Sequence, residues 1–500
     1  MKIVLNKARY KFFDYEDVLS KKEVCSLLHP RSIKKYENHW VVSSSIEDEK
    51  ILIKNSKRLT YFHSFEINES VFETDQKLLE EKCSKSGKAK RQSTKYGAHG
   101  VHDYKGKFNP QVVSSLINIF NLNEKSIILD PFCGSGTVML EAKYKGINAI
   151  GVDINPMAAF IANTKLQSSS KDAKEIKGFL NAINKRLLIK KNQHIENSSR
   201  INYLSKWLDE DHIFAFENLK NAINEVDDLN SKNILLCCAS NTIRDYSLQD
   251  PDDLRIRRRK SPMPEKPMLQ KFLEECESYI SNISAFEKVD EIKPKAYNRD
   301  IRSDLSLKDF KKFDAAITSP PYATALPYID TQRLSLIWLG LSEPEEIKSL
   351  EWSLIGSREA TKSNIKELQA ELVNNQNDIP KKLHALCMDM VYSLDESDGF
   401  RRKAVPYLMY RYFTDMQSMF INVAKKLKKN APFALVVGHN HTTLGGKRYD
   451  LDTPSYLCSI AASVGWSIQE NMPLETYHRY GLHSKNAVNS ESLLFLRKLG

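Results

Sequence analysis

The chain has 500 residues, of which 41% are hydrophobic and 9% aromatic, so it is long enough for several domain-sized units with a buried core. These values exclude a globally disordered chain. Lysine and arginine number 74 against 63 aspartate and glutamate residues, which gives a formal net charge of +11. This excess favours polyanionic partners but does not by itself indicate nucleic-acid binding.

No stretch of the sequence approaches the roughly 18 apolar residues that a membrane span requires. Met1 is followed by Lys2 and further charged residues, where a signal peptide would have an apolar core. We therefore expect a soluble, cytoplasmic protein with no membrane partner. The eight cysteines are scattered, with no CxxC pair and no cysteine and histidine cluster at zinc-ligand spacing. We expect reduced, mostly buried thiols and no metal site.

The N-terminal residues 1–83 are expected to form a small mixed α/β accessory domain. β-type runs occur at residues 40–42, 51–53 and 61–62, and a helical pattern covers residues 15–28. Small, polar and basic residues follow over 84–100 and are typical of a basic linker.

Beyond this linker the spacing of apolar residues alternates between the helical period and the short continuous runs that are typical of buried strands. Residues 110–120 have apolar side chains at helical spacing. A short apolar run at 126–130 ends in an acid and is followed by the segment PFCGSGT, a helical pattern at 138–145 and a second apolar run at 149–153. This order of strand, glycine loop, helix and strand is typical of a parallel crossover unit.

The rest of the chain alternates sheet signals with long polar segments. Residues 165–295 and 341–402 are helix-rich and exceed any normal connection, so each should be a helical insert. Core segments are expected at 101–164, 296–340 and 403–500, the last with helical patterns at 410–427 and 455–464 and strand patterns at 433–438 and 492–496. Strands that alternate with helices predict an α/β fold, with helices on both faces of a parallel sheet.

Asp130 and the loop after it predict a binding site for an adenosine ligand. Gly134 and Gly136 would let the backbone approach a ligand without a Cβ clash, at the edge where open parallel sheets bind ligands. Asp153 closes the next strand, 19 residues after Gly134, and could accept both hydroxyls of a ribose. The loop has neither a GxGxxG nor a GK[ST] pattern, and Asp130 would repel a pyrophosphate. A cationic ligand such as S-adenosylmethionine is favoured.

These segments resemble the amino-methyltransferases of DNA, which have a Rossmann-like fold and use S-adenosylmethionine. DPFCGSGT at 130–137 resembles the cofactor loop of that family, GVDINP at 151–156 its ribose-binding strand end, and KGKFNP at 105–110 the segment that packs over the methionine moiety. SPPY at 319–322 matches the catalytic tetrapeptide. The resemblance covers residues 100–165 and 296–498, and it leaves out the N-terminal domain and both inserts.

The resemblance also implies a set of cofactor-binding residues, in which Asp300 takes the place of the acid at the adenine edge. These residues are Lys107, Phe108, Pro110, Asp130, Phe132, Gly134, Gly136, Thr137, Asp153 and Asp300.

The tetrapeptide Ser319, Pro320, Pro321 and Tyr322 suits methyl transfer to an exocyclic base amine, whose lone pair is delocalised into the ring. Acceptors at the Ser319 hydroxyl and the Pro320 carbonyl would favour the pyramidal nitrogen of the transition state. Consecutive prolines hold these acceptors stiffly, and Tyr322 offers a stacking face for a base flipped out of the duplex. We expect no dedicated general base, because Ser319 is too weakly basic at neutral pH.

Serine at the first position of the tetrapeptide leans toward cytosine N4 within the family that this sequence resembles. Adenine N6, a guanine-N2 methyltransferase of tRNA and an inactive DNA-binding scaffold stay open as alternatives. The sequence contains no Pro-Cys dipeptide, so attack by a cysteine on a ring carbon is disfavoured. The expected substrate is double-stranded DNA. If the enzyme serves a restriction-modification system, a companion restriction endonuclease should be another chain.

Contacts to DNA are expected on segments outside the resemblance. The run RIRRRK at 255–260 is the densest basic cluster and the first candidate, although a solvated helix face explains it nearly as well. The candidate residues are Arg244, Arg255, Arg257, Arg258, Arg259 and Lys260. Arg401, Arg402 and Lys403 would add phosphate contacts. Tyr328 and Arg333 either line the base pocket or pack, with packing slightly favoured.

Overall fold

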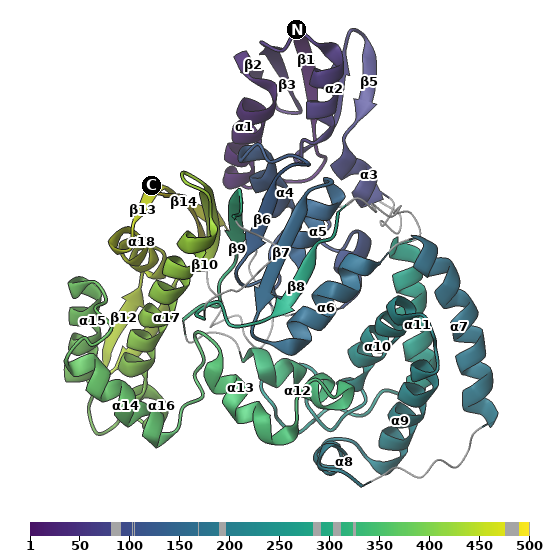
Figure 1. Ribbon diagram of the computed structural model, residues 1–500, viewed down its shortest axis with the longest axis vertical. Helices are drawn as coiled ribbons and strands as arrows, with labels where there is room; N and C mark the ends of the chain where they lie inside the picture. Colours follow the sequence, from purple (N-terminus) through teal and green to yellow (C-terminus); the bar gives the residue numbers. More distant parts are fainter. Residues whose placement is uncertain are drawn as a thin grey trace.

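The computed structural model describes residues 1–81, 92–102, 104, 106–168, 170–189, 197–283, 292–303, 312–323, 327–475 and 490–499. These residues form an α/β molecule around a central sheet. The N-terminal domain lies at one end, and two groups of helices lie beyond the other end of the sheet (Figure 1).

The central sheet has seven strands, of which five run parallel. Their spatial order is β8 (Lys295–Asn298), β7 (Asn148–Asp153), β6 (Ile127–Asp130), β9 (Ala315–Thr318) and β10 (Pro432–Gly438). β14 (Ser490–Lys498) pairs antiparallel with β10, and β13 (Trp466–Glu475) pairs antiparallel with β14 at the edge. The α/β fold expected from the sequence is confirmed.

Helices cover both faces of this sheet, which explains why its parallel strands are continuous apolar runs. Successive residues of β6 enter different cores: Ile128 packs in one cluster and Leu129 in the other. The first cluster is lined by α4 (Pro110–Ile119), α5 (Thr137–Tyr144) and α6 (Pro156–Gln167). The second is lined by α17 (Val405–Lys426) and α18 (Thr453–Ser463).

The N-terminal domain has its own antiparallel sheet and its own small core. The strand order is β2 (Pro30–Lys35), β3 (His39–Ser44), β1 (Lys2–Lys7), β4 (Phe62–Ile67) and β5 (Ser70–Glu73), with helices α1 (Asp14–Leu28), α2 (Glu49–Lys57) and α3 (Asp75–Glu81). The strand expected at 51–53 is wrong, because these residues lie in α2. Asp48 accepts a hydrogen bond from the Ile51 amide as the N-cap, and Leu52 and Ser56 are buried one turn apart.

A buried polar network joins this domain to the central core. Glu23 of α1 is fully buried and accepts hydrogen bonds from the Thr60 hydroxyl at 2.7 Å and from Asn118 Nδ2 of α4 at 2.8 Å. Burial raises the pKa of Glu23. Because each of these polar atoms depends on a partner from another segment, the domain is held in one position against the sheet.

The basic linker expected over 84–100 needs a correction at its C-terminal end. Residues 97–100 form a short 3₁₀ helix, and Tyr96 and Ala98 are buried in the core. The Tyr96 hydroxyl donates to Glu141 at 2.7 Å, and His99 Nε2 lies 2.7 Å from the same carboxylate. Buried Glu141 thus gives these polar residues a partner inside the protein. Residues 84–91 lie outside the described residues.

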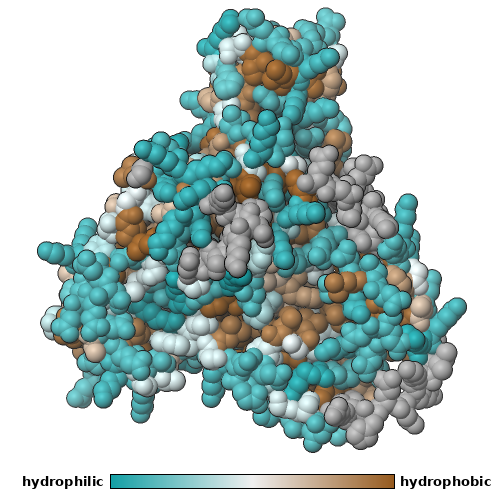
Figure 2. Space-filling model, viewed as in Figure 1, coloured by the Kyte–Doolittle hydropathy of each residue, from teal (hydrophilic) through white to brown (hydrophobic). Residues whose placement is uncertain are grey.

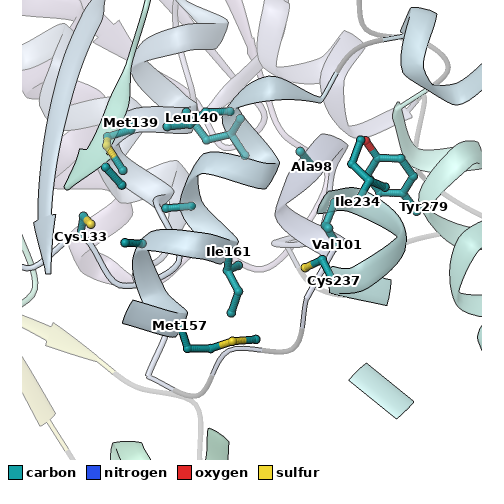
Figure 3. Packing of buried hydrophobic residues seen from close by; sticks show 14 of the residues in the cluster. Ala98, Val101, Cys133, Met139, Leu140, Met157, Ile161, Ile234, Cys237 and Tyr279 are labelled. Atoms are coloured by element: carbon teal, nitrogen blue, oxygen red, sulfur yellow. The ribbon is translucent and has the colours of Figure 1, made fainter. Parts of the chain in front are cut away.

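Both inserts are helical, as expected. The first holds α7 (Ser170–Ile189), α8 (Ser199–Leu204), α9 (Glu210–Asn224), α10 (Leu229–Ile243) and α11 (Met268–Ile283). Figure 3 shows Ile234 and Cys237 of α10 and Tyr279 of α11 in the same cluster as Val101 and Ile161. The first insert therefore shares the core of the sheet and is not a detached subdomain.

The second insert lies between α12 (Tyr328–Leu339) and α17. Its helices are η2 (Pro344–Glu346), α13 (Ile347–Ser353), α14 (Lys362–Val373), α15 (Lys381–Tyr392) and α16 (Phe400–Lys403). α14 and α15 pack on α17. A hairpin of β11 (Asn440–Leu444) and β12 (Lys447–Leu451) follows β10 and turns at two glycines with positive φ.

Hydrophilic side chains cover most of the face seen in Figure 2. Within the described ranges, no helix has the length and apolar character needed to cross a membrane. The described cysteines form no disulfide, and five of these seven are buried, as the sequence led us to expect.

Gly136, the residue that caps α5, is the point where that helix approaches α6 most closely. Its φ is +81°, and a Cβ added there would lie 2.9 Å from the Cβ of Ala162. Gly146, at the other end of α5, has a φ of +68° and nothing within 4 Å of an added Cβ.

We predict that Gly136→Ala lowers the free energy of unfolding by at least ~2 kcal/mol, and that Gly146→Ala lowers it by about 1 kcal/mol. Both variants strain the backbone, but only the first also forces α5 away from α6. Thermal melting of the two variants measures the difference. Equal melting temperatures would contradict a close contact of the two helices at Gly136.

Candidate active site

The glycine loop and the tetrapeptide begin at the ends of two neighbouring strands. β6 and β9 are parallel, with Ile128 opposite Ala315 and Leu129 opposite Ala316. Their carboxyl ends therefore meet at the same edge of the sheet. The hydroxyl of Thr318, the residue before the tetrapeptide, donates a hydrogen bond of 2.6 Å to Asp130 Oδ1, and both side chains are buried. The two motifs open onto one site.

Asp130 carries a carboxylate in a strongly desolvated position. It is 3% exposed, and burial raises its pKa to about 7. The Phe132 amide donates to Oδ1 at 3.2 Å, the same oxygen that Thr318 uses. No residue in the described part of the chain donates to Oδ2, which leaves that oxygen for a cationic ligand.

Asp153 holds the glycine loop in place. Its Oδ2 accepts a hydrogen bond from the Gly134 amide at 2.9 Å, and its Oδ1 accepts one from the Asn155 amide at 2.9 Å. Burial raises the pKa of Asp153 to about 6. Each oxygen keeps a second lone pair, so the carboxylate can accept a ribose hydroxyl in addition to the loop amide.

Tyr104 is a residue of the site that the sequence patterns did not single out. An added Cβ at Gly134 would lie 3.3 Å from its ring, and the φ of Gly134 is +46°, so glycine suits this position beneath the tyrosine. Burial and the nearby Asp153 raise the pKa of the Tyr104 hydroxyl. Its position just before the KGKFNP segment was the one available signal.

The predicted cofactor residues around Tyr104 have structural contacts. Lys107 Nζ donates to the carbonyls of His99 at 2.9 Å and Thr94 at 3.2 Å. Phe108 packs against the first core cluster, and Pro110 is the first residue of α4. These residues support the segment that brings Tyr104 to the loop.

Asp300 follows β8 and is paired with an arginine. Arg302 Nε lies 3.0 Å from Asp300 Oδ1, and Arg302 Nη2 lies 2.7 Å from Oδ2. Arg302 Nη1 reaches Asp415 of α17 at 3.0 Å. An adenine edge would contact the lone pairs of the Asp300 carboxylate that Arg302 does not use. No sequence pattern indicated the role of this arginine, since its second partner, Asp415, is distant in the chain.

The tetrapeptide is held from several sides. Ser319 Oγ donates to the Val436 carbonyl of β10 at 3.3 Å, and the Tyr412 hydroxyl donates to the Pro321 carbonyl at 3.2 Å. The Tyr322 hydroxyl donates to Glu491 of β14 at 2.7 Å, which fixes the direction of the ring. Burial and Glu491 raise the pKa of Tyr322.

Two acceptors of the tetrapeptide are left for a substrate. The Ser319 proton goes to Val436, so the lone pairs of its oxygen face outward from that bond. The carbonyl of Pro320 receives no hydrogen bond from any described residue. These are the two acceptors that the chemistry of an exocyclic amine requires.

The residues downstream of the tetrapeptide mostly pack. Arg333 of α12 pairs with Asp330 at 2.6 Å and with Glu351. Tyr328 lies in a desolvated position, which raises its pKa. His439 lies 3.4 Å from Asp452. No group of three or more histidine, cysteine or acidic side chains able to hold a metal ion occurs among the described residues.

Most of the predicted DNA-binding residues between α10 and α11 have partners within the protein. Arg244 donates to the carbonyls of Asp250 and Asp253. Arg259 donates to the carbonyls of Ser247 and Asp245 at 2.9 and 2.6 Å.

The other basic residues of this run differ in whether their side chains contact the rest of the protein. Arg257 pairs with Asp253 at 3.1 Å, and the Arg258 guanidinium lies 4.7 Å from the centre of the Trp207 ring. The side chains of Arg255 and Lys260 contact no described residue through a hydrogen bond or ion pair. The basic run therefore stabilises the loop between α10 and α11, and only some of its side chains are available to a ligand.

Comparison with known proteins shows similarity to DNA methyltransferases, and the match to a family model is confined to the N-terminal third of the chain. The sequence model described as DNA methylase matches residues 3–164. M.MvaI, a type II methyltransferase of Kocuria varians, is 26% identical over 277 residues, 51% of this chain and 60% of that protein. M.BsoBI, a type II methyltransferase of Geobacillus stearothermophilus, is 25% identical over 383 residues, 68% of this chain and 73% of that protein.

A shorter match connects the chain with RNA enzymes. A tRNA (guanine(10)-N2)-dimethyltransferase of Methanothermobacter thermautotrophicus is 35% identical over 52 residues, which are 10% of this chain and 16% of that protein.

The chain is similar to the DNA amino-methyltransferases. The resemblance seen in the motifs is supported at this level, and S-adenosylmethionine is the methyl donor of the family. The match to M.MvaI spans about 60% of that relative. The matched range of the family model includes the N-terminal domain, which the motif resemblance had left out.

We predict that Thr318→Val weakens S-adenosylmethionine binding by about tenfold, since it removes a hydrogen bond to a charged group worth roughly 1.5 kcal/mol. The change keeps the shape of the side chain, so the melting temperature should change little. Isothermal titration calorimetry with the methyl donor measures the effect. Unchanged affinity would show that Asp130 does not depend on Thr318 for its ionised form.

Proposed function

We propose that this chain is an S-adenosylmethionine-dependent DNA methyltransferase that acts on an exocyclic base amine, with cytosine N4 as the favoured target. The observation that carries the proposal is the buried hydrogen bond between Thr318 and Asp130. It brings the loop that suits a cationic methyl donor and the tetrapeptide that suits a base amine to one edge of the sheet. We propose that the enzyme protects DNA as the modification partner of a separate restriction endonuclease.

The residues at the glycine loop fit S-adenosylmethionine. Asp130 is buried and Asp153 half-buried beside the glycine loop, and their raised pKa values indicate that a nearby cation would stabilise the ionised forms. S-adenosylmethionine carries a sulfonium and an ammonium and supplies an electrophilic methyl group when bound. Gly134 and Gly136 let the loop pack closely against Tyr104 and α6, and we propose that Phe132, Thr137 and Asp300 join the loop in binding the ligand.

The tetrapeptide would prepare the amine for attack. Ser319 Oγ and the Pro320 carbonyl accept the two amino hydrogens, which draws the nitrogen lone pair out of conjugation with the ring. The rigid proline pair and the bond from Tyr412 to Pro321 keep both acceptors in place. Tyr322, held by Glu491, stacks on the extruded base. The proton leaves to water after methyl transfer, since no described side chain at the tetrapeptide is a strong base.

Two other targets compete with cytosine N4. Adenine N6 has the same amine chemistry, and the serine of the tetrapeptide is the feature that favours cytosine. A guanine amine of tRNA is favoured by the local similarity to a tRNA (guanine(10)-N2)-dimethyltransferase. The much longer matches to type II methyltransferases favour DNA.

One experiment separates these targets. Purified protein is incubated with the tritiated methyl donor and either duplex DNA or tRNA, and the labelled polymer is digested to nucleosides. We expect N4-methylcytosine from DNA. N6-methyladenine would move the target to adenine, label in tRNA would overturn the DNA assignment, and no label in either polymer would overturn the enzymatic role.

We predict that Ser319→Ala lowers kcat by at least ~100-fold, comparable with the loss of one transition-state hydrogen bond. Its affinity for S-adenosylmethionine should stay within about twofold of the wild type, because Ser319 belongs to the amine side of the site. Single-turnover kinetics and calorimetry give the two values. Ser459→Ala, on the exposed surface of α18, is the matched control. Full activity of Ser319→Ala would contradict the role of the tetrapeptide.

We predict that the affinity for S-adenosylmethionine rises with pH between about 5.5 and 7.5 and then levels off. In the free protein the pKa values of Asp153 and Asp130 are about 6 and about 7, so both acids are partly protonated in this range. A cationic ligand binds the ionised carboxylates and releases the protons.

Calorimetry from pH 5.5 to 8.5 tests this dependence. Asp130→Asn should bind the methyl donor more weakly and lose the part of the dependence near pH 7. Asp153→Asn should lose the part near pH 6. An affinity of the wild-type protein that does not change with pH would contradict a cation at these two acids.

A further inference from the structure

The loop between α13 and α14 lies directly on the tetrapeptide. It turns at Gly356, whose φ is +73°, and a Cβ added there would lie only 2.5 Å from the Tyr322 carbonyl oxygen. Arg358 follows two residues later and is partly exposed to solvent. The second insert therefore delivers an arginine to the rim of the candidate active site.

A second arginine lies on a helix that contacts the hairpin beside the tetrapeptide. Asn440 Nδ2 of β11 donates to the Ala323 carbonyl at 2.6 Å, one residue after Tyr322. β11 also contacts α16, the short helix that carries Arg401. The Arg401 side chain is exposed.

The first insert supplies the third arginine. Gln249 Nε2 donates to the Asp330 carbonyl of α12 at 3.3 Å, which ties the loop between α10 and α11 to the helix that follows the tetrapeptide. Arg255 lies in this loop and is half-buried, and its amide donates to Asp253 Oδ1 at 2.9 Å.

Arg255, Arg358 and Arg401 form one cluster of like charge. Partial burial and the two neighbouring guanidinium groups lower the pKa of Arg358, and Glu359 is the one acid that opposes this effect. None of the three guanidinium groups forms a hydrogen bond or ion pair with a residue in the described ranges. Three cations held together without a paired acid repel one another, and a bound anion relieves that repulsion.

This cluster differs from the neighbouring basic run. Arg257, Arg258 and Arg259 are engaged with Asp253, Trp207 and backbone carbonyls. Arg255 instead lies near Arg358 and Arg401 of the second insert. Neither the sequence of the basic run nor that of the second insert indicates this proximity by itself.

We propose that Arg255, Arg358 and Arg401 bind backbone phosphates of the DNA strand that carries the target base, beside the nucleotide that enters the site. The inference rests on the proposed function. A guanidinium group binds phosphate oxygens through two parallel hydrogen bonds. Contacts of this kind position a strand without reading its sequence, and at the rim of the site they would hold the phosphates of an extruded nucleotide, whose unstacking costs a few kcal/mol.

Arginine to glutamine variants test the cluster one side chain at a time. The binding of a fluorescent duplex is measured by anisotropy at several salt concentrations. Arg255→Gln, Arg358→Gln and Arg401→Gln should each reduce the slope of log K against log salt concentration by about 0.9, the value expected for one phosphate contact. The triple variant should bind at least tenfold more weakly at 0.15 M salt.

Arg31→Gln provides the control for net charge. Arg31 lies on β2 of the N-terminal domain, and its side chain is 68% exposed. This variant should keep the wild-type slope. The affinity of the three test variants for S-adenosylmethionine and their melting temperatures should equal those of the wild type, because the cluster lies outside the cofactor loop.

The outcomes separate the inference from the proposed function. Wild-type DNA binding with an unchanged salt slope in the three variants would overturn the phosphate cluster and leave the methyltransferase proposal standing. Failure of the wild-type protein to bind duplex DNA would overturn both. A loss of cofactor affinity or of melting temperature that parallels the loss of DNA binding would show a structural role and overturn the inference. Arg358→Lys, which keeps the charge, should retain the slope but reduce kcat.

Discussion

A buried carboxylate at the end of β6 is the constraint on which the rest of the site depends. Asp130 is desolvated, and its nearest donors are the Phe132 amide and the hydroxyl of Thr318, 188 residues away in the sequence. The hydrogen bond is possible because β9 pairs directly with β6. Both polar groups are buried away from water, so each needs a hydrogen-bond partner. Their bond thus fixes the glycine loop and the tetrapeptide beside each other at one edge of the sheet.

Patterns that are local in the sequence predicted the fold well. The runs that became β6, β7 and β10 are apolar on both faces, and helical spacing marked α4, α5 and α18. Prediction failed where a partner decides the structure. Residues 51–53 have β-type side chains, yet the cap at Asp48 and burial at one-turn spacing make them helical. Residues 96–100 end a stretch of mostly small, polar and basic residues, but Glu141 pairs with the side chains of Tyr96 and His99 inside the core.

The candidate site shows the same division between local and distant information. The residues of DPFCGSGT and SPPY could be named from their own neighbours in the sequence. Their supports could not, because Tyr322 is held by Glu491, 169 residues later, and Asp130 is held by Thr318, 188 residues later. A motif specifies the groups that would touch the ligands, whereas the sheet topology decides which side chains fix them.

In this protein, the density of basic residues in the sequence does not show which of their side chains are free to bind a ligand. Arg244 and Arg259 use their donors on backbone carbonyls, where they replace water in closing the loop between α10 and α11. An arginine bound in this way cannot reach a phosphate without opening that loop. Arg358 belongs to no basic run, but its loop lies on Tyr322. A position beside the tetrapeptide, near two other arginines and without an ion pair among the described residues, favours nucleic-acid contact more strongly than the local density of basic residues does.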